Sequence, residues 1–272
     1  MTSGAASAAL RVASRLGYPA DDPLVVSETN NTLVWLRPHA VIAKVGTQPH
    51  SADTLAREHA VAMALPSDAS IARAVPGVAP SIDERSGAVV TLWERIDSDA
   101  REIADPRAIG VSLLELHRAL ATYRGDLPNF LIGVGRAWEV LADDGAMEGL
   151  PEDDRSFLGS TFGRLVEELD RRRGYVEQPL HGEPHGGNLL LSGAGPCWID
   201  LENVCIGPLE WDLAFLPEGA VEVFPRVDEK LLELLRLLSS ACVATWCWSR
   251  PWRPELRRHG ELHLARLRDA EA

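Results

Sequence analysis

The change from strand-like to helix-like sequence patterns along this chain constrains its fold more than any other feature. Short β-prone runs separated by turn-like residues occupy roughly the first 95 residues, whereas nearly everything after residue 100 has the periodicity of helices. Chains that segregate strands from helices in this way fold as α+β proteins. The pattern therefore predicts a β-rich N-terminal lobe, residues 1–95, and a mostly helical C-terminal lobe, residues 96–272.

Residue periodicity also predicts the individual elements. Strands are expected at 24–27, 32–36, 40–45 and 88–93, with two short strand-like pieces at 189–191 and 197–199. Helices are expected at 5–16, 51–65, 106–121, 137–141, 152–173, 228–248 and 254–270. The most apolar stretch, 231–248, contains Glu233, Arg236 and several hydroxyl side chains, so it is predicted to be a buried core helix and not a membrane span.

The overall charge limits the partners that this chain can bind. Its 272 residues include 27 Lys and Arg against 40 Asp and Glu, a formal net charge of −13. Because nucleic acids and anionic membranes would be repelled, neither is expected as a partner, and small cationic molecules are favoured. The four cysteines form no CxxC pair, and the first residues do not resemble a signal peptide, so a reducing, cytoplasmic location is expected.

One loop carries a pattern suited to phosphoryl transfer. Residues 181–188 read HGEPHGGN, and Asp200 ends the short strand-like piece that follows. The density of glycine and proline predicts a tight loop. In this loop Glu183, two residues after His181, can accept or orient the proton of an attacking hydroxyl group. Asn188 and Asp200 supply hard oxygen ligands for a Mg²⁺ ion that bridges nucleotide phosphates.

The order and spacing of these residues resemble the aminoglycoside phosphotransferase family, part of the wider kinase-like superfamily. That family carries a His-Gly-Asp-x-His-x-x-Asn loop, an Ile-Asp strand end and a Gly-Pro-x-x-Trp-Asp-Leu-Ala segment, which stands here at 207–214. The resemblance covers residues 32–214. It implies a two-lobed protein-kinase-like fold, ATP as the phosphoryl donor with GTP as an alternative, and Mg²⁺ as the metal.

The resemblance also implies nucleotide-binding residues. Lys44, one of only two lysines among 27 basic residues, would contact the phosphates and pair with Glu58 on the following helix. An exposed strand lysine and a solvated helix glutamate are the alternatives for this pair. The turn containing Asn31 would cover the phosphates, although no GxGxxG sequence occurs there. The segment from Trp93 to Arg95 would offer backbone groups to the base.

The catalytic loop departs from the family at one position. Glu183 stands where the family carries aspartate, and its additional methylene moves the carboxylate further from the backbone. Three outcomes are open: a working base in an adjusted loop, a weakened enzyme, or a protein that binds nucleotide without transferring phosphate. Because the other polar residues are all present, activity is favoured. The resemblance implies that His181 and Asp212 hold the loop in place.

These features predict an ATP-dependent kinase that phosphorylates a hydroxyl group of a small cationic or sugar-like substrate, with an aminoglycoside-type antibiotic as the first candidate. One alternative is a metabolite kinase that acts on an amino sugar, a choline-like alcohol or another antibiotic; another is a pseudokinase-like nucleotide-binding module. A monomer or a weak homodimer is expected. Three acids could line an anionic substrate pocket or form a solvated face: Glu202, Glu218 and Glu222.

Overall fold

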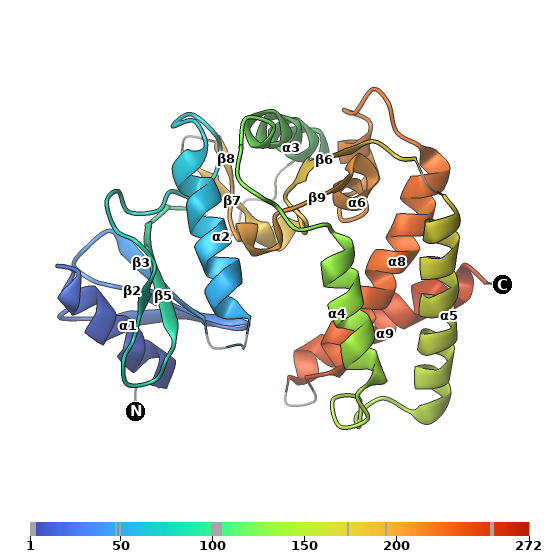
Figure 1. Cartoon of the computed structure of the whole chain (residues 1–272), viewed down its shortest axis with the longest axis horizontal. Helices are drawn as coiled ribbons and strands as arrows, with labels where there is room; N and C mark the ends of the chain where they lie inside the picture. Colours follow the sequence, from blue (N-terminus) through green and yellow to red (C-terminus); the bar gives the residue numbers. More distant parts are fainter. Residues whose placement is uncertain are drawn as a thin grey trace. The chain divides into compact units, whose positions relative to one another are not determined.

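The computed structural model describes residues 4–46, 48, 50–98, 105–172, 174–193, 195–250 and 253–271 (Figure 1). The chain packs into two compact units. Unit 1 comprises Met1–Asp126 and His185–Val204, and unit 2 comprises Leu127–Pro184 and Cys205–Ala272. Each unit consists of segments that pack together, and each combines two separate stretches of the sequence. The lobe boundary between residues 95 and 96 stays a prediction.

Unit 1 is built around a five-stranded antiparallel sheet with the strand order β1-β2-β3-β5-β4. Four of its strands match the predicted positions: β1 (Leu24–Glu28), β2 (Asn31–Trp35), β3 (Val41–Gly46) and β5 (Val89–Glu94). The two-residue strand β4 (Ser81–Ile82) was not predicted, because two residues are too short to show an alternating pattern. Short connections join β1 to β2 and β2 to β3, so the consecutive strands pair antiparallel.

Helices cover both faces of this sheet. Helix α1 (Gly4–Arg15) packs on one face, where its small residues Ala9 and Ala13 belong to one buried cluster with Ala43 and Val45 of β3. Figure 1 shows α2 (Ser51–Ala64) on the opposite face of the sheet from α1. Lys44 lies between Ala43 and Val45 on β3. Because side chains alternate along a strand, Lys44 points toward α2.

A helix and a hairpin complete unit 1. Helix α3 (Pro106–Leu120) begins after Asp105, whose side chain caps the helix by accepting a hydrogen bond from the amide of Ala108. It packs against the hairpin of β7 (Leu189–Ser192) and β8 (Gly195–Trp198). Short 3₁₀ turns, η1 (Gly186–Asn188) and η2 (Leu201–Asn203), flank this hairpin. The hairpin therefore brings the segments that contain Asn188 and Asp200 to the same end.

Unit 2 is mainly helical and is organised around α8 (Glu229–Trp248). Asp228 caps α8 by accepting hydrogen bonds from the amides of Lys230 and Leu231. The strands β6 (Glu177–Leu180) and β9 (Cys205–Pro208) pair antiparallel, and the short helix α7 (Glu218–Val221) follows them in sequence. Four helices contact α8: α4 (Leu131–Ala142), α5 (Glu152–Arg171), α6 (Leu209–Leu213) and α9 (Pro254–Asp269).

Helix α8 is long and apolar enough to cross a membrane by length and composition, with a mean hydropathy of 1.3 over an 18-residue window. In the structure 72% of that window is buried inside the protein. Neighbouring helices already cover most of the apolar surface that a bilayer would have to cover. The helix therefore packs as the core helix that its charged and hydroxyl residues predict.

Replacing Leu92 by alanine is expected to lower the free energy of unfolding by about 2–5 kcal/mol, because it leaves a cavity in a closely packed core. Leu92 lies on β5, is 1% exposed and belongs to the cluster that joins the sheet to α1. The matched variant Ile82→Ala removes an aliphatic side chain that is 58% exposed, and should change stability by less than about 0.5 kcal/mol. Urea unfolding measures both, and equal losses would contradict this assignment of the core.

Candidate active site

Strand alternation places Lys44 in the interior of unit 1. Its neighbours Ala43 and Val45 pack on the α1 side of β3, so its own side chain points to the α2 side. There the Lys44 Nζ atom lies 2.8 Å from Oε2 of Glu58 on α2. Lys44 is 6% exposed and Glu58 is 3% exposed. The expected ion pair is thus formed, and both of its members are buried.

Two further carboxylates reach the same ammonium group. Oδ1 of Asp200 lies 2.8 Å from Lys44 Nζ, and Oε1 of Glu202 lies 2.5 Å from it. Asp200 has a φ of 65°, and it is the only non-glycine residue with a positive φ in the described part of the chain. Aspartate and asparagine adopt this left-handed conformation more readily than most residues. Backbone strain of this kind is often found at functional sites.

The charges in this cluster are not balanced. Burial alone would lower the pKa of Lys44, but the carboxylates of Glu58, Asp200 and Glu202 raise it above its ordinary value. Burial raises the pKa of Glu202 to about 8 and also raises the pKa of Glu58, and the negative charge of Asp200 adds to both shifts. One ammonium group thus faces three carboxylates, and a second cation would relieve the surplus of negative charge.

Glu202 lies in this cluster, although its sequence position suggested a substrate acid. The Nδ2 atom of Asn31 on β2 donates a hydrogen bond to Glu202 Oε1 at 2.5 Å. The Nη2 atom of Arg57 on α2 donates to the main-chain oxygen of Glu202 at 2.9 Å. The turn that was expected to cover the phosphates is therefore tied to the segment that carries Asp200. Arg57 was not predicted, because nothing in the sequence distinguishes it from a solvated cation on a helix.

The oxygen atoms of this cluster are suited to a divalent cation. One carboxylate oxygen from each of Glu58, Asp200 and Glu202 lies within 4.8 Å of the others. Asn188 is buried at the start of the β7–β8 hairpin, and its main-chain oxygen accepts a hydrogen bond from the amide of Ile199, just before Asp200, at 2.9 Å. Carboxylate and amide oxygens are the ligands that Mg²⁺ prefers. The residues present therefore fit the predicted metal.

In unit 2 a buried aspartate holds the predicted catalytic loop. Asp212 of α6 and His181, which follows β6, are both 0% exposed. The Asp212 carboxylate accepts hydrogen bonds from the amides of His181 and Gly182, both at 2.8 Å. Gly182 has a φ of 93°, which favours glycine, and its oxygen accepts a hydrogen bond from Trp211 Nε1 at 3.0 Å. These contacts fix the main chain immediately before Glu183.

Glu183 itself is partly exposed beside this fixed backbone. Its amide donates a hydrogen bond to Nδ1 of His181 at 3.3 Å. Burial raises the pKa of the Cys242 thiol on α8 to about 12, and the nearby charge of Glu183 adds to this shift. Burial lowers the pKa of Arg250, while the charge of Glu183 opposes the change. Cys242 and Arg250 are neighbours that the sequence did not reveal, because they lie on or just after a helix with a core pattern.

Other predicted residues have contacts that bear on their expected roles. The amides of Glu94 and Arg95 donate to main-chain oxygens at 2.8 and 2.9 Å, so these two donors are not available to a nucleotide base. Recognition of the base by this segment would need other backbone groups. Trp93 is buried within unit 1. Glu218 and Glu222 are exposed on and after α7, and their role in substrate binding stays a prediction.

Comparison of the sequence with protein families finds one that covers most of the chain. The family described as "Phosphotransferase enzyme family" matches residues 25–258, a range that includes Lys44, the catalytic loop and Asp212. The chain belongs to this family. It is therefore a phosphotransferase of the small-molecule kinase class, whose members phosphorylate hydroxyl groups. No sequence among the curated proteins matches it.

Solved structures with the same fold include kinases of several small molecules. The GDP complex of aminoglycoside 2'-phosphotransferase-IIIa has a TM-score of 0.71 at 12% identity, covering 99% of this chain and 100% of the other. A microcompartment-associated aminopropanol kinase has a TM-score of 0.68 at 17% identity, covering 94% of each chain. A choline kinase from Streptococcus pneumoniae has a TM-score of 0.67 at 14% identity, covering 94% and 96%. These similarities establish the kinase-like α+β fold.

Proposed function

We propose that this protein transfers the γ-phosphoryl group of ATP, or of GTP in its place, to a hydroxyl group of a small molecule. The observation that carries the proposal is the cluster around the buried Lys44, where one ammonium group meets three carboxylates. Buried charges are costly unless they are compensated, and this cluster has more negative than positive charge. A nucleotide bound with a divalent cation would use both the ammonium group and the surplus carboxylates.

The nucleotide side of the reaction would use the residues of this cluster. A bound nucleotide with Mg²⁺ supplies the phosphoryl group and neutralises the charge that develops during its transfer. Glu58 holds the Lys44 side chain, whose ammonium group would contact the phosphates. Asp200 and Asn188 would hold the metal, with Glu202 as a further carboxylate beside them. These side chains are buried or held by hydrogen bonds, so little reorganisation would be needed on binding.

The acceptor side would use the loop in unit 2. Glu183 would orient the acceptor hydroxyl group and accept its proton. The Asp212 carboxylate fixes the two amides before Glu183, and His181 Nδ1 accepts from the Glu183 amide. Fixing the backbone limits where the longer glutamate side chain can reach, and positioning of this kind contributes most of the catalysis in phosphoryl transfer. These hydrogen bonds support a fixed main-chain position for the loop that carries Glu183.

For the acceptor we propose a hydroxylated amine, with an aminoglycoside-type antibiotic as the first candidate and a metabolite such as an amino sugar or choline-like alcohol as the second. The net charge of −13 favours cationic small molecules. The similar structures include kinases named for aminoglycosides, aminopropanol and choline, which are all hydroxylated amines. We further propose a cytoplasmic protein that acts as a monomer or weak homodimer. Antibiotic resistance would follow from the first candidate only.

A panel of acceptors tests the proposed substrate class. Purified protein is incubated with ATP, Mg²⁺ and one acceptor from each class: aminoglycosides, short amino alcohols, choline, and neutral sugars of similar size. Release of ADP that depends on the acceptor is the expected result for at least one hydroxylated amine. Turnover of the neutral sugars alone would contradict the proposed charge of the acceptor while leaving phosphoryl transfer intact.

Glu183 stands where the family carries aspartate, and this difference favours a second candidate, a nucleotide-binding module without transfer activity. Glutamate keeps the negative charge but moves it by one methylene, and a displacement of about 1 Å can cost about 10²-fold in rate. Stabilisation of the protein by nucleotide, measured as a rise in Tm, combined with no phosphoryl transfer to any acceptor would support this candidate. Acceptor-dependent turnover would exclude it.

Replacing Lys44 by arginine is expected to weaken productive nucleotide binding although the charge is kept. Lys44 is buried among three carboxylates, and a planar, longer guanidinium group cannot occupy the position of a compact ammonium group. We expect kcat/KM for nucleotide to fall by at least about tenfold, or 1.4 kcal/mol. The matched control is Lys230→Arg, because Lys230 is exposed on α8. If both variants keep the wild-type kcat/KM, the assignment of Lys44 is wrong.

A further inference from the structure

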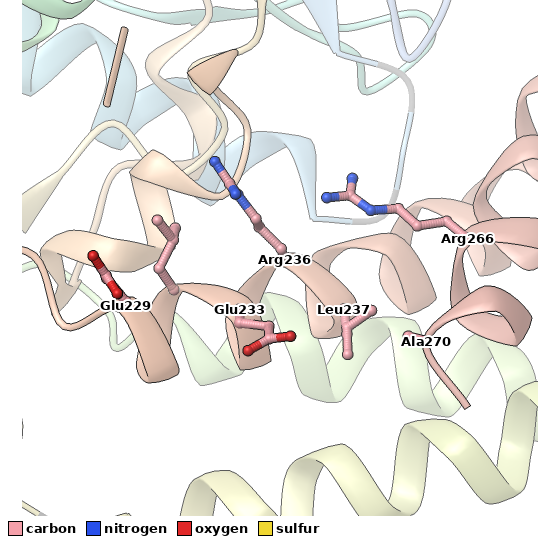
Figure 2. A pocket seen from close by; sticks show the side chains of 7 residues that line it. Glu229, Glu233, Arg236, Leu237, Arg266 and Ala270 are labelled. Atoms are coloured by element: carbon pink, nitrogen blue, oxygen red, sulfur yellow. The ribbon is translucent and has the colours of Figure 1, made fainter. Parts of the chain in front are cut away.

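A pocket between α8 and α9 in unit 2 contains none of the residues used in the proposed phosphoryl transfer. It has a volume of about 440 Å³ and its lining includes Glu229, Glu233, Arg236, Leu237, Arg266 and Ala270 (Figure 2). All of these residues lie in the described part of α8, of α9 or directly after α9. The pocket is therefore a groove on the surface of unit 2, and Glu229, Glu233, Arg266 and Ala270 in its lining are exposed.

Two arginines in this pocket extend into the same region. Figure 2 shows Arg236 from α8 and Arg266 from α9 on the same side of α8, with Arg266 extending toward Arg236. Within the described residues neither guanidinium group has a hydrogen bond or an ion pair. By contrast, Arg268 of α9 pairs with Asp154, and Arg257 of α9 lies over an aromatic ring. Among the described residues, Arg236 and Arg266 thus differ from Arg257 and Arg268 in having no acidic or aromatic partner.

The two guanidinium groups also repel each other. Partial burial of the guanidinium group lowers the pKa of Arg266, and the positive charge of Arg236 lowers it further, so the two charges are close enough to interact. Glu233 precedes Arg236 by three residues on the same helix, but Figure 2 shows its carboxylate directed away from the guanidinium group. Guanidinium groups that lack an acidic partner are suited to bind oxyanions, because their planar donors match the oxygen atoms of carboxylate and phosphate.

We infer that this pocket binds the phosphate group of a small phosphomonoester. A phosphomonoester carries close to two negative charges at neutral pH and can therefore pair with both guanidinium groups, whereas a carboxylate would neutralise only one. The two carboxylates of the lining, Glu229 and Glu233, are exposed to solvent. Leu232 and Leu237 provide apolar surface for the carbon part of such a ligand. A volume of about 440 Å³ falls within the range of sites for small metabolites. Binding would replace the repulsion between Arg236 and Arg266 by attraction to a shared anion.

Isothermal titration calorimetry with glycerol phosphate and, separately, with inorganic phosphate tests this inference. We expect the wild-type protein to bind glycerol phosphate, and both Arg236→Gln and Arg266→Gln to raise its Kd by at least about tenfold. The matched control Arg258→Gln removes the same charge from an exposed position on α9 and should leave the Kd unchanged. Glu233→Gln should lower the Kd, because it removes a negative charge from the lining of the pocket.

Phosphate could also bind in the proposed nucleotide site, so Lys44→Ala is titrated in parallel. Binding that survives Lys44→Ala but is weakened by both pocket variants supports the inference. Tighter binding of glycerol phosphate than of inorganic phosphate would show that the pocket recognises the whole phosphomonoester. Equal affinity for the two compounds would show that it recognises the phosphate group alone. The inference would be overturned if neither compound binds the wild-type protein, if Lys44→Ala abolishes binding, or if Arg258→Gln raises the Kd as much as the two pocket variants do. Circular dichroism confirms that each variant is folded, and the two arginines on separate helices provide independent tests.

Discussion

Replacing Glu183 by glutamine is expected to lower kcat for phosphoryl transfer by about 10²–10⁴-fold while nucleotide affinity is kept. Glutamine has nearly the size and hydrogen-bonding capacity of glutamate, but it cannot accept the proton of the acceptor hydroxyl group. The loop should fold as before, because Asp212 binds main-chain amides and makes no use of the side chain at position 183. Single-turnover transfer rates and a nucleotide titration of the same protein measure the two quantities.

Two further variants separate the effect of charge from the effect of reach. Glu167→Gln on α5 removes one exposed carboxylate from the same unit and should leave kcat unchanged. Glu183→Asp keeps the charge but shortens the side chain, and a loop built around glutamate predicts a loss that can approach about 10²-fold. A wild-type rate in Glu183→Gln would show that this carboxylate is not the general base.

Replacing Asp200 by asparagine is expected to lower kcat by at least about 100-fold, or 2.7 kcal/mol, and to raise the Mg²⁺ concentration needed for half-maximal activity. The variant removes one negative charge from the predicted metal ligands. Asparagine tolerates the positive φ of this position as well as aspartate does, and its side-chain oxygen can still accept a hydrogen bond from Lys44. The structure should therefore be kept. Initial rates over a series of Mg²⁺ concentrations measure both effects.

The control for this prediction is Asp53→Asn. Asp53 is exposed on α2, so its replacement removes the same charge from the same unit without touching the cluster. Its kcat and its Mg²⁺ dependence should match those of the wild-type protein. A kcat for Asp200→Asn within about threefold of wild type, a difference of roughly 0.7 kcal/mol, would refute the assignment of Asp200 as a metal ligand.

The parts of the fold that could be predicted are those with a strong, local pattern. Four of the five strands of the sheet and the long helices α5, α8 and α9 lie close to their predicted positions, because alternation and helical periodicity extend over enough residues to be recognised. Helix α4 was predicted only from residue 137, although it begins at Leu131. Gly133 and Gly135 lower the helix propensity of its first turns, and tertiary packing compensates for them.

The parts of the site that could be predicted are those that depend on spacing along the chain. The pairing of Lys44 with Glu58, which lies 14 residues further on in the next helix, was expected from the family resemblance, and strand alternation places Lys44 on the side of the sheet that faces this helix. The contacts of Glu202 with Asn31 and Arg57 join residues separated by 171 and 145 positions. Such pairs depend on how the η2 turn packs against α2, which no local pattern in a single sequence encodes.

Transfer of a labelled γ-phosphoryl group is the most direct test of the proposed function. The protein is incubated with ATP carrying a radioactive γ-phosphate, Mg²⁺ and each hydroxylated amine in turn, and the products are separated by chromatography. The proposed reaction predicts label in an acid-stable phosphomonoester of one acceptor, and loss of that product in Glu183→Gln and Asp200→Asn. Label found only in inorganic phosphate or unreacted ATP, from a protein that still binds nucleotide, would contradict the proposed phosphoryl transfer.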